Sequence, residues 1–435
     1  MAEVAYDLED TFQQGDHTDT PTTKILNGLG KPIAEVQLLT ASGAPIAHDF
    51  TYDELGNLTG WVDPDGNQRA QAYDLLGRVV SVDDPDRGLR TYTYDDAGNI
   101  LAKTDATGAT WRAEYDGDNR PLAEWDDADA TTSRIEYRYD APGDCPAEHC
   151  TNLAGRLAVV SFPLDDGARG EERFGYDIRG KTRFVGRLLD DHLFEFRSAY
   201  DTLGRPRADI LPTGEQIDYT LDGAGKIVAI PGYVDQVSYD ARGGLAELEL
   251  ANGVTVSYTR DERMRVSAIA ATGAAGASVL DYSYARDRVG NITEVTDGRD
   301  DDGGPIGGAL YQYDALYRLT QAELDPARSD HRELLSYGYD TLGNIISKES
   351  SWGADSPAHV GDLSYCEGGA GPHAVTSAGD LSLGYDAAGR LTSRGGDAYT
   401  WDYQGRMTGS TSASGVEASY VYGYSVERLI KRVDG

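Results

Sequence analysis

Short stretches of this sequence alternate polar and apolar residues with a period of two, and turn-forming residues separate them. Residues 90–95 alternate polar residues with Tyr and Thr, which is typical of a strand with two unlike faces. Residues 95–99 have turn chemistry, because an Asp carboxylate accepts bonds from nearby backbone N–H groups and Gly98 tolerates positive φ. Residues 100–104 resume the strand pattern, and residues 105–108 form a second turn. The stretch predicts antiparallel strands joined by tight turns, with Gly98 at positive φ.

The Tyr-Asp pair that ends the strand recurs at a fixed step. It stands at Tyr52, Tyr73, Tyr94 and Tyr115, each followed by Asp, and each pair lies 21 residues after the one before. A fixed period of this length indicates a repeat architecture. The corners that we predict to be structural are Tyr52, Asp53 and Gly56; Tyr73, Asp74 and Gly77; Tyr94, Asp95 and Gly98; Tyr200, Asp201 and Gly204; Tyr339, Asp340 and Gly343; and Tyr385, Asp386 and Gly389.

Some copies of the corner depart from this pattern. Asn119 replaces the turn Gly, and Asn is the residue next best able to adopt positive φ. Met264 and Tyr317 stand at the same position in two other corners. Because these side chains disfavour positive φ, the sequence predicts another turn type at both.

The repeats imply a simple organisation of the chain. Residues 1–50 are less regular and read as degenerate repeats, whereas residues 51–435 carry the repeat, with an irregular insertion near residues 141–157. No stretch has a helical stripe of any length. The predicted fold class is all-β, a ribbon of antiparallel hairpins.

Composition and charge narrow the classes of partner. The net charge of −34 repels nucleic acid and anionic lipid. The 28 Tyr exceed the 7 Phe and 5 Trp, which favours a thin sheet with apolar rings and hydroxyls in water. No apolar run approaches the roughly 20 residues of a membrane helix. The first ten residues are acidic and lack an apolar signal core, so we expect another export route or an internal piece of a longer protein.

The corner sequences resemble the YD repeats of the RHS family, which includes polymorphic toxins, the shell-forming subunits of insecticidal toxin complexes and the YD shell of teneurins. The family unit reads roughly Y-D-x-x-G-[RN]-[LIV], and the resemblance covers the chain from about Asn27 to its end. Matching copies stand at residues 73–79, 94–100, 200–205, 339–345 and 385–391, and residues 371–376 resemble the late part of the RHS core.

The resemblance implies a ribbon that spirals into part of a hollow β-shell around a cargo domain. In the family a C-terminal segment closes the shell and precedes a variable toxin, and this sequence stops at Gly435 without that segment. We therefore expect an open wall whose end, residues 403–433, is a poorly protected strand edge. The implied partner is an encapsulated or adjacent C-terminal effector polypeptide, and the implied location is secreted or at the cell surface.

Two segments carry residues that could hold a metal. Cys145, His149 and Cys150 lie close together, and Cys and His are zinc ligands. A second cluster with matching spacing is missing, so a local Cys145–Cys150 disulfide or two free thiols are favoured over a metal site. Residues 297–304 are acidic enough to attract calcium but lack EF-hand spacing, which favours a solvated loop. We therefore assign no metal and no cofactor.

Regular repetition also argues against catalysis. An active site needs unlike residues that converge once, whereas the Tyr-Asp corners recur throughout the chain. We assign no catalytic residues and expect a non-catalytic shell or scaffold. One alternative is a cell-surface module that binds a glycan or a protein receptor through exposed Tyr and Asp. A less favoured alternative is a carbohydrate-active β-propeller, because two units approach the ~40–45 residues of a blade.

Overall fold

The computed structural model describes residues 1–7, 20–40, 43–164, 167–301, 304–326, 331–425 and 427–434. Within these residues the chain forms 38 strands and three short 3₁₀ helices. The chain divides into two compact units, each built from an early and a late segment. Unit 1 comprises Met1–Gly88 and Tyr239–Tyr385, and unit 2 comprises Leu89–Ser238 and Asp386–Gly435.

The early strands of unit 1 are β1 (Ala2–Ala5), β2 (Thr22–Leu26), β3 (Pro32–Leu38), β4 (Pro45–Tyr52), β5 (Leu58–Val62), β6 (Gln68–Tyr73) and β7 (Val79–Asp84). Strand β21 (Val234–Tyr239) ends where the late segment begins. The late strands are β22 (Leu245–Leu250), β23 (Thr255–Arg260), β24 (Val266–Thr272), β25 (Ser278–Arg286), β26 (Ile292–Asp301), β27 (Gly304–Tyr313), β28 (Leu319–Leu324), β29 (Glu333–Tyr339), β30 (Ile345–Ser350), β31 (Gly361–Tyr365), β32 (Val375–Ala378) and β33 (Leu381–Tyr385). The 3₁₀ helices η2 (Gly353–Asp355) and η3 (Glu367–Gly369) flank β31.

The early strands of unit 2 are β8 (Gly88–Tyr94), β9 (Ile100–Thr104), β10 (Thr110–Tyr115), β11 (Pro121–Asp126), β12 (Ile135–Tyr139), β13 (Leu157–Pro163), β14 (Arg169–Tyr176), β15 (Thr182–Leu189), β16 (His192–Tyr200), β17 (Pro206–Ile210), β18 (Gln216–Asp218), β19 (Thr220–Leu221) and β20 (Ile227–Ala229). Helix η1 (Asp127–Asp129) follows β11. The late strands are β34 (Leu391–Arg394), β35 (Asp397–Trp401), β36 (Met407–Thr411), β37 (Glu417–Tyr422) and β38 (Arg428–Asp434).

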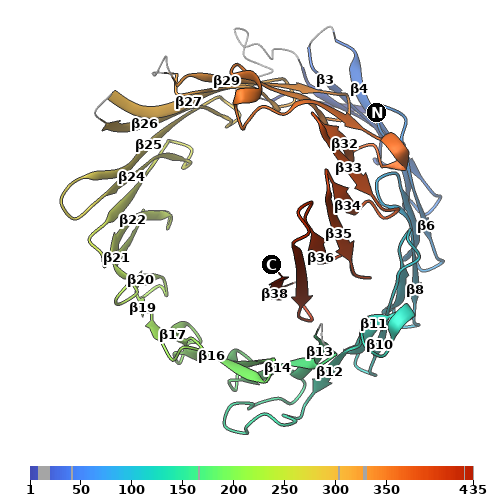
Figure 1. The fold of residues 1–435 in the computed structure, drawn as a ribbon, viewed down its shortest axis with the longest axis vertical. Helices are drawn as coiled ribbons and strands as arrows, with labels where there is room; N and C mark the ends of the chain where they lie inside the picture. Colours follow the sequence, from blue (N-terminus) through green and yellow to red (C-terminus); the bar gives the residue numbers. More distant parts are fainter. Residues whose placement is uncertain are drawn as a thin grey trace. The chain divides into compact units, whose positions relative to one another are not determined.

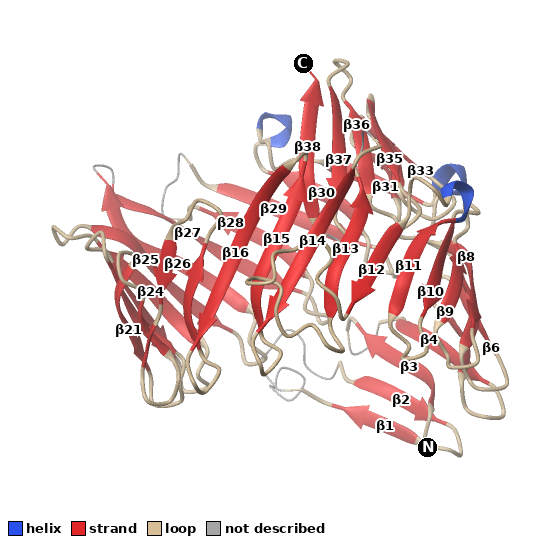
Figure 2. Ribbon diagram, turned by 90° about the horizontal axis from the view of Figure 1, so that it is seen from below, coloured by secondary structure: helices blue, strands red, loops and turns tan. Residues whose placement is uncertain are grey.

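Strands that follow one another in the chain pair antiparallel along the ribbon, as β12 to β16 show in Figure 2. Polar turns this short can join only antiparallel neighbours. At the corners the register shifts at the Tyr, for example between Thr51 and Tyr52. The predicted all-β antiparallel ribbon is confirmed, and its sheet is not closed. Four-stranded propeller blades are not the observed arrangement.

In unit 1 the late segment contacts the early one through polar groups at turns. The backbone N–H of His373 donates to Asp86 Oδ1 at 2.9 Å, and its ring Nδ1 lies 2.8 Å from Asp86 Oδ2. The hydroxyl of Thr341 donates to the carboxylate of Asp65. These partners are 287 and 276 residues apart in sequence, so the contacts join distant repeats.

Unit 2 contains the two hydrophobic clusters of the described chain. In the first, Val160, Phe162 and Phe174 of β13 and β14 are buried against Val421 of β37 and Leu429 of β38. The late strands therefore form a second layer over the early ones, and Figure 1 shows β38 beside β13. The second cluster gathers around Cys145 and Cys150 on the opposite face of the early sheet.

Among the described residues, no helix is long and apolar enough to span a membrane. The predicted boundary at residue 50 stays a prediction. The two compact units are defined by contacts between early and late segments, and their boundaries lie at other residues.

Candidate functional site

Each corner is organised by its Asp carboxylate, as the corner at Asp74 shows. Asp74 Oδ1 accepts the backbone N–H groups of Leu76 and Arg78, both at 2.9 Å. Asp74 Oδ2 accepts from Arg78 Nε at 2.7 Å. The N–H of Gly77 donates to the carbonyl of Asp74 at 3.0 Å, and Gly77 has a φ of 77°. Every part of the Asp-x-x-Gly-Arg sequence therefore has a defined role in one turn.

Asn can take the place of the cation. At the first matched corner, Asn57 Nδ2 donates to Asp53 Oδ2 at 2.8 Å, and its backbone N–H donates to Oδ1 at the same distance. Asn99 and Asn344 make the corresponding pairs of bonds. The [RN] position of the repeat thus selects side chains that present an N–H to the carboxylate.

These hydrogen bonds decide what the Asp residues can do chemically. The backbone N–H of Arg78 is the main cause that lowers the pKa of Asp74, and desolvation, the next largest cause, opposes it. The amide of Asn99 is the main cause that lowers the pKa of Asp95. A carboxylate held ionised, with its oxygens already bonded inside its own turn, suits a structural role better than proton transfer.

In ten corners the Tyr connects one repeat to the one before. The hydroxyl of Tyr73 donates to the carbonyl of Leu58 at 2.8 Å, and that of Tyr339 donates to the carbonyl of Leu319 at 2.7 Å. In each case the donor is the last residue of its strand, and the acceptor is the first strand residue after the preceding corner. The same bond is made by Tyr52, Tyr139, Tyr176, Tyr200, Tyr313, Tyr365, Tyr385 and Tyr422.

We call this series the hydroxyl ladder. It corrects the expectation that the Tyr hydroxyls lie in water, because these ten hydroxyls are bonded to backbone carbonyls. Trp401 occupies one Tyr position and preserves the bond, since its Nε1 donates to the carbonyl of Leu391 at 2.7 Å. The aromatic ring is not required for this bond, because Arg260 and Arg286 stand at the same position and donate from Nη2 to the carbonyls of Leu245 and Val266 at 3.1 and 3.3 Å.

Arginines add a second connection between corners. The guanidinium of Arg318, already bound to Asp314, lies 4.5 Å from the ring centroid of Tyr339 in the next corner. Its Nη1 also donates to the carbonyl of Asp340 at 3.2 Å. One Arg therefore closes its own turn and contacts the next one.

The corners without Gly correct a second expectation. Met264 and Tyr317 have φ values of 65° and 60°, and their backbone N–H groups donate to Asp261 and Asp314 carbonyls at 2.9 Å. The prediction of another turn type is therefore wrong at both corners. Asn119 adopts a φ of 62°, as its residue type suggested. The bonds to the carboxylate hold the left-handed conformation even where the side chain disfavours it.

The structure places the other predicted residues at equivalent positions. The corner glycines, Gly98 at 94° included, all have positive φ, and each Tyr ends a strand. The six predicted corners are not brought together at one point, because they are distributed along the ribbon.

The insertion near residues 141–157 contains a disulfide between Cys145 and Cys150. Both cysteines are 5% exposed. His149, between them, stacks on Phe184 with ring centroids 4.8 Å apart. A Cβ on Gly175 would lie 1.9 Å from the carbonyl oxygen of His149, so the loop fits a strand position that lacks a side chain.

The described residues contain no group of three or more His, Cys, Asp and Glu that could hold a metal ion. The expectation of a solvated loop at residues 297–304 is wrong, because residues 297–301 belong to β26 and Gly304 begins β27. Asp297 is 5% exposed and bonds to Arg299, with Oδ2 and Nη2 2.6 Å apart. Asp302 and Gly303 lie outside the described residues. The carboxylate of Asp297 is therefore already neutralised by its own neighbour.

Sequence reasoning missed the surface between the two layers of unit 2. Arg187 of β15 donates from Nε to Glu172 at 2.7 Å and from Nη2 to Glu427 at 2.9 Å. Glu172 is 4% exposed, and burial raises its pKa while Arg187 opposes that rise. Glu427 lies 240 residues from Arg187 in sequence, so no local pattern could have connected them.

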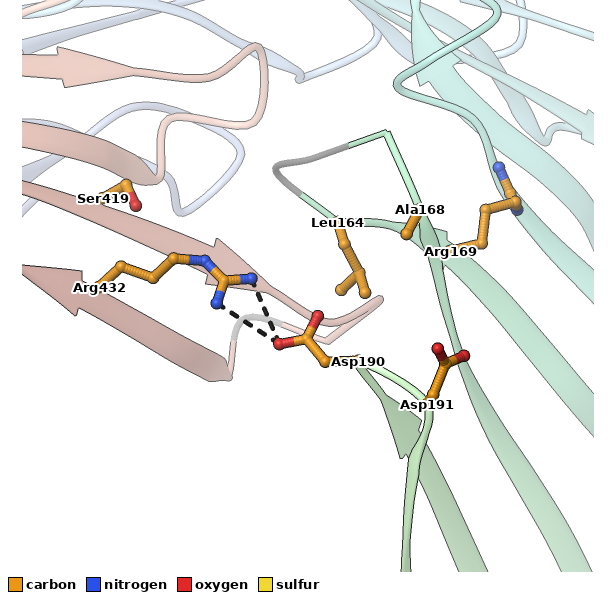
Figure 3. Close-up of a pocket in the computed structure, with 7 residues that line it drawn as sticks. All are labelled: Leu164, Ala168, Arg169, Asp190, Asp191, Ser419 and Arg432. Atoms are coloured by element: carbon orange, nitrogen blue, oxygen red, sulfur yellow. Dashed lines mark hydrogen bonds and ion pairs between the residues drawn. The ribbon is translucent and has the colours of Figure 1, made fainter.

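An open groove of about 660 Å³ lies at one end of this layered surface (Figure 3). Arg432 of β38 and Asp190, in the turn between β15 and β16, form an ion pair across it at 3.4 Å. The other lining residues are Leu164, Ala168, Arg169, Asp191 and Ser419. Among the described lining residues the charged groups Arg432 and Asp190 are paired with each other, and no acid, base and nucleophile converge as in a hydrolytic site.

Comparisons with known proteins agree with this geometry. The sequence pattern of the RHS Repeat family matches residues 52–89, 73–110, 94–124 and 385–417. No match was found among curated proteins.

Similar solved structures cover almost the whole chain. The crystal structure of TcdB2-TccC3 has a TM-score of 0.84 at 19% identity, over 99% of this chain and 25% of that chain. TcdB2-TccC3 without its hypervariable C-terminal region gives 0.85 at 18% identity, over 100% of this chain and 24% of that chain. The Photorhabdus luminescens Tc holotoxin pore with the mutation TccC3-D651A gives 0.84 at 18%, over 99% and 24%. The chain thus spans about a quarter of the length of these relatives, and at this identity the likeness shows the fold.

Proposed function

We propose that this chain, an RHS-repeat protein with the fold of the Tc-toxin RHS shell, is a non-catalytic scaffold of an exported protein. In this proposal its sheet encloses or presents a C-terminal effector polypeptide encoded beyond the chain. The hydroxyl ladder and the Asp-bonded corners carry the proposal, because they commit the repeated polar groups to the wall itself.

The fold likeness supports the same role. Solved relatives include TcdB2-TccC3 and a complex named TcdB2-TccC3-Cdc42. The disulfide of the insertion supports export, because disulfides persist in oxidising compartments. A glycan or receptor site stays a prediction. The corner Tyr residues give little support to such a site, since ten of their hydroxyls are already bonded to backbone carbonyls.

Protease protection tests the proposal directly. The natural polypeptide that contains this chain is incubated with a broad-specificity protease, beside its isolated C-terminal effector. We expect the effector to survive longer within the natural polypeptide than alone. Equal rates of digestion would refute enclosure. Association of the two as separately expressed chains, measured by native mass, would then decide whether the scaffold presents the effector instead.

Turnover assays test the non-catalytic assignment. We expect no hydrolysis of glycans, peptides or nucleotides by the purified chain. A reproducible turnover that one substitution outside the corners abolishes would contradict it.

A further inference from the structure

The loop that joins β30 to β31 is held to the sheet by polar side chains. This loop, residues 351–360, contains η2 and lies within unit 1. Its first aromatic residue, Trp352, is 44% exposed and donates from Nε1 to the carbonyl of Arg332 at 3.1 Å. The loop is therefore a surface segment whose position depends on a few hydrogen bonds, and Ser350 makes three of them.

Ser350, the last residue of β30, is the centre of these bonds. Its hydroxyl donates to Glu333 Oε1 of β29 at 2.6 Å and accepts the backbone N–H of Trp352 at 3.0 Å. Its own backbone N–H donates to Nδ1 of His359 at 3.2 Å. The hydroxyl of Ser356 donates to the same Glu333 oxygen. Ser350 thus connects both ends of the loop, because Trp352 lies near its start and His359 near its end.

The Nδ1 nitrogen of His359 has two competing neighbours. A ring nitrogen that accepts a hydrogen bond carries no proton, so the bond from Ser350 requires Nδ1 to be unprotonated. Glu349 Oε2 lies 3.3 Å from the same nitrogen, and a carboxylate can bond it only when Nδ1 carries a proton. One protonation state therefore suits the bond with Ser350, and the other suits the bond with Glu349.

The charged residues on the surrounding elements leave Glu349 as the partner of the ring. They are Lys348 and Glu349 of β30, Glu333 of β29, Asp355 of η2 and Asp362 of β31. Among the described residues, only Glu349 lies within ion-pair distance of His359. Hydrogen bonds from Ser350 and Ser356 lower the pKa of Glu333, so its carboxylate stays ionised above its usual range. Imidazole is the side chain whose charge changes between about pH 5 and 8, so the cluster holds one titrating group in that range.

We propose that His359 is a proton-operated latch that holds the loop at residues 351–360 to the sheet. With Nδ1 unprotonated, the ring accepts the N–H of Ser350 and the loop stays closed. When Nδ1 takes a proton from solvent, that bond is lost and the ring pairs with Glu349 instead. The loop then loosens, and Trp352 with it. The latch goes beyond the proposed scaffold function, because it makes one segment of the sheet responsive to acid.

Hydrogen–deuterium exchange of the full chain tests the latch at about pH 7.5 and about pH 5.5, near the two ends of the range in which imidazole titrates. Mass spectrometry follows the peptides that contain Ser350 and the loop, and each rate is corrected for the intrinsic effect of pH on amide exchange. We expect protection of these peptides to fall about tenfold at the lower pH, because one backbone hydrogen bond is lost. Peptides from β23 and β24 of the same unit should keep their protection, which verifies that the unit stays folded.

Two variants identify the groups that form the latch. His359→Gln keeps a side-chain oxygen that can accept the N–H of Ser350 but does not titrate, so we expect its protection to agree within about twofold at the two pH values. Glu349→Gln keeps the imidazole and removes the anion that favours the protonated ring, so we expect the loop to loosen at a lower pH than in the wild type. His48→Gln is the control, since His48 lies on β4 of the same unit, and it should respond as the wild type does.

Several results would overturn the latch. These are equal protection of the wild-type loop at the two pH values, an undiminished pH response in His359→Gln, and an unchanged pH of loosening in Glu349→Gln. If the loop of His359→Gln is unprotected at both pH values, the Gln side chain does not restore the bond, and the Glu349→Gln result alone decides. None of these results bears on the scaffold function, which protease protection tests separately.

Discussion

The corner at Asp74 and the corner at Asp314 make the same hydrogen bonds, yet they differ at the residue with positive φ. Gly77 occupies that position in the first corner and Tyr317 in the second. In both, the carboxylate accepts two backbone N–H groups and an Arg Nε at 2.7 Å. Gly avoids the strain of the left-handed conformation, whereas Tyr must be held in it.

The comparison separates the role of the Asp and its Arg or Asn from the role of the Gly, which occur together in the repeat sequence. The Asp and the following Arg or Asn define the turn, and Gly makes it less costly. A corner that lacks Gly should therefore depend more on its Asp. The predictions below test this dependence.

Asp314→Ala should have the largest effect. We expect a loss of about 2–3 kcal/mol, because the carboxylate accepts three hydrogen bonds that hold Tyr317 in a strained left-handed conformation. Midpoints of chemical denaturation measure the loss. Asp74→Ala is the matched control, and its smaller loss is expected because Gly77 tolerates the same φ. The variant Tyr317→Phe measures separately how much the hydrogen bond from the Tyr317 hydroxyl to Asp7 contributes to stability. Equal losses in the two Ala variants would contradict the comparison.

Gly98→Val should lower stability by about 1–2 kcal/mol. Gly98 has a φ of 94°, and no atom lies within 4 Å of its ideal Cβ, so the loss comes from backbone strain alone. Gly117→Val is the control, since Gly117 has the same open space without positive φ. Thermal unfolding of both variants measures the difference. A comparable loss at Gly117 would argue against backbone strain as the cause.

Asp74→Asn should change how stability depends on pH. The folded-state pKa of Asp74 lies below the ordinary Asp value of 3.8, so its contribution is present above that pH and is lost as pH falls through the folded pKa. We expect wild type to be more stable than the variant at pH 7, and the difference to shrink below about pH 4. Denaturation midpoints from neutral to acid pH measure it. A difference that does not change with pH would show that the charge is not involved.

Met264→Gly should have the smallest effect, within about 0.5 kcal/mol. Relief of the left-handed strain is worth about 1 kcal/mol, and the greater entropy of Gly in the unfolded chain offsets most of it. Calorimetry is sensitive enough to resolve the sign. A large stabilisation would mean that the carboxylate leaves strain in the corner that only Gly removes.

Local chemistry explains how much of the fold the sequence predicts. Strand alternation and the positive φ of Gly98 could be predicted because each depends on residues a few positions apart, and the Tyr-Asp corners could be predicted because they recur at a fixed step of 21 residues. The turn at Tyr317 could not, since residue preference argued against it and the bonds to Asp314 outweighed that preference.

The contacts between the two layers of unit 2 could not be predicted from the sequence, for a different reason. Arg187 and Glu427 meet only because the late strands pack over the early sheet, and neither residue stands in a motif that indicates a partner. The acceptors of the hydroxyl ladder were equally hidden, because a backbone carbonyl such as that of Leu58 has no sequence signature. A backbone carbonyl can accept a hydrogen bond whichever side chain its residue carries, so the sequence does not reveal which residue is the acceptor.

The hydroxyl ladder also bears on how such a chain can change in evolution. Each joint takes its donor from one repeat and its acceptor from the preceding one, and the repeats of the hydroxyl ladder offer both in the same places. Deleting or duplicating one whole repeat therefore leaves each remaining Tyr facing a carbonyl of the same kind. A gene with this property can lengthen or shorten by whole copies without a compensating mutation at the new junction. A change of half a copy would place two donors or two acceptors side by side.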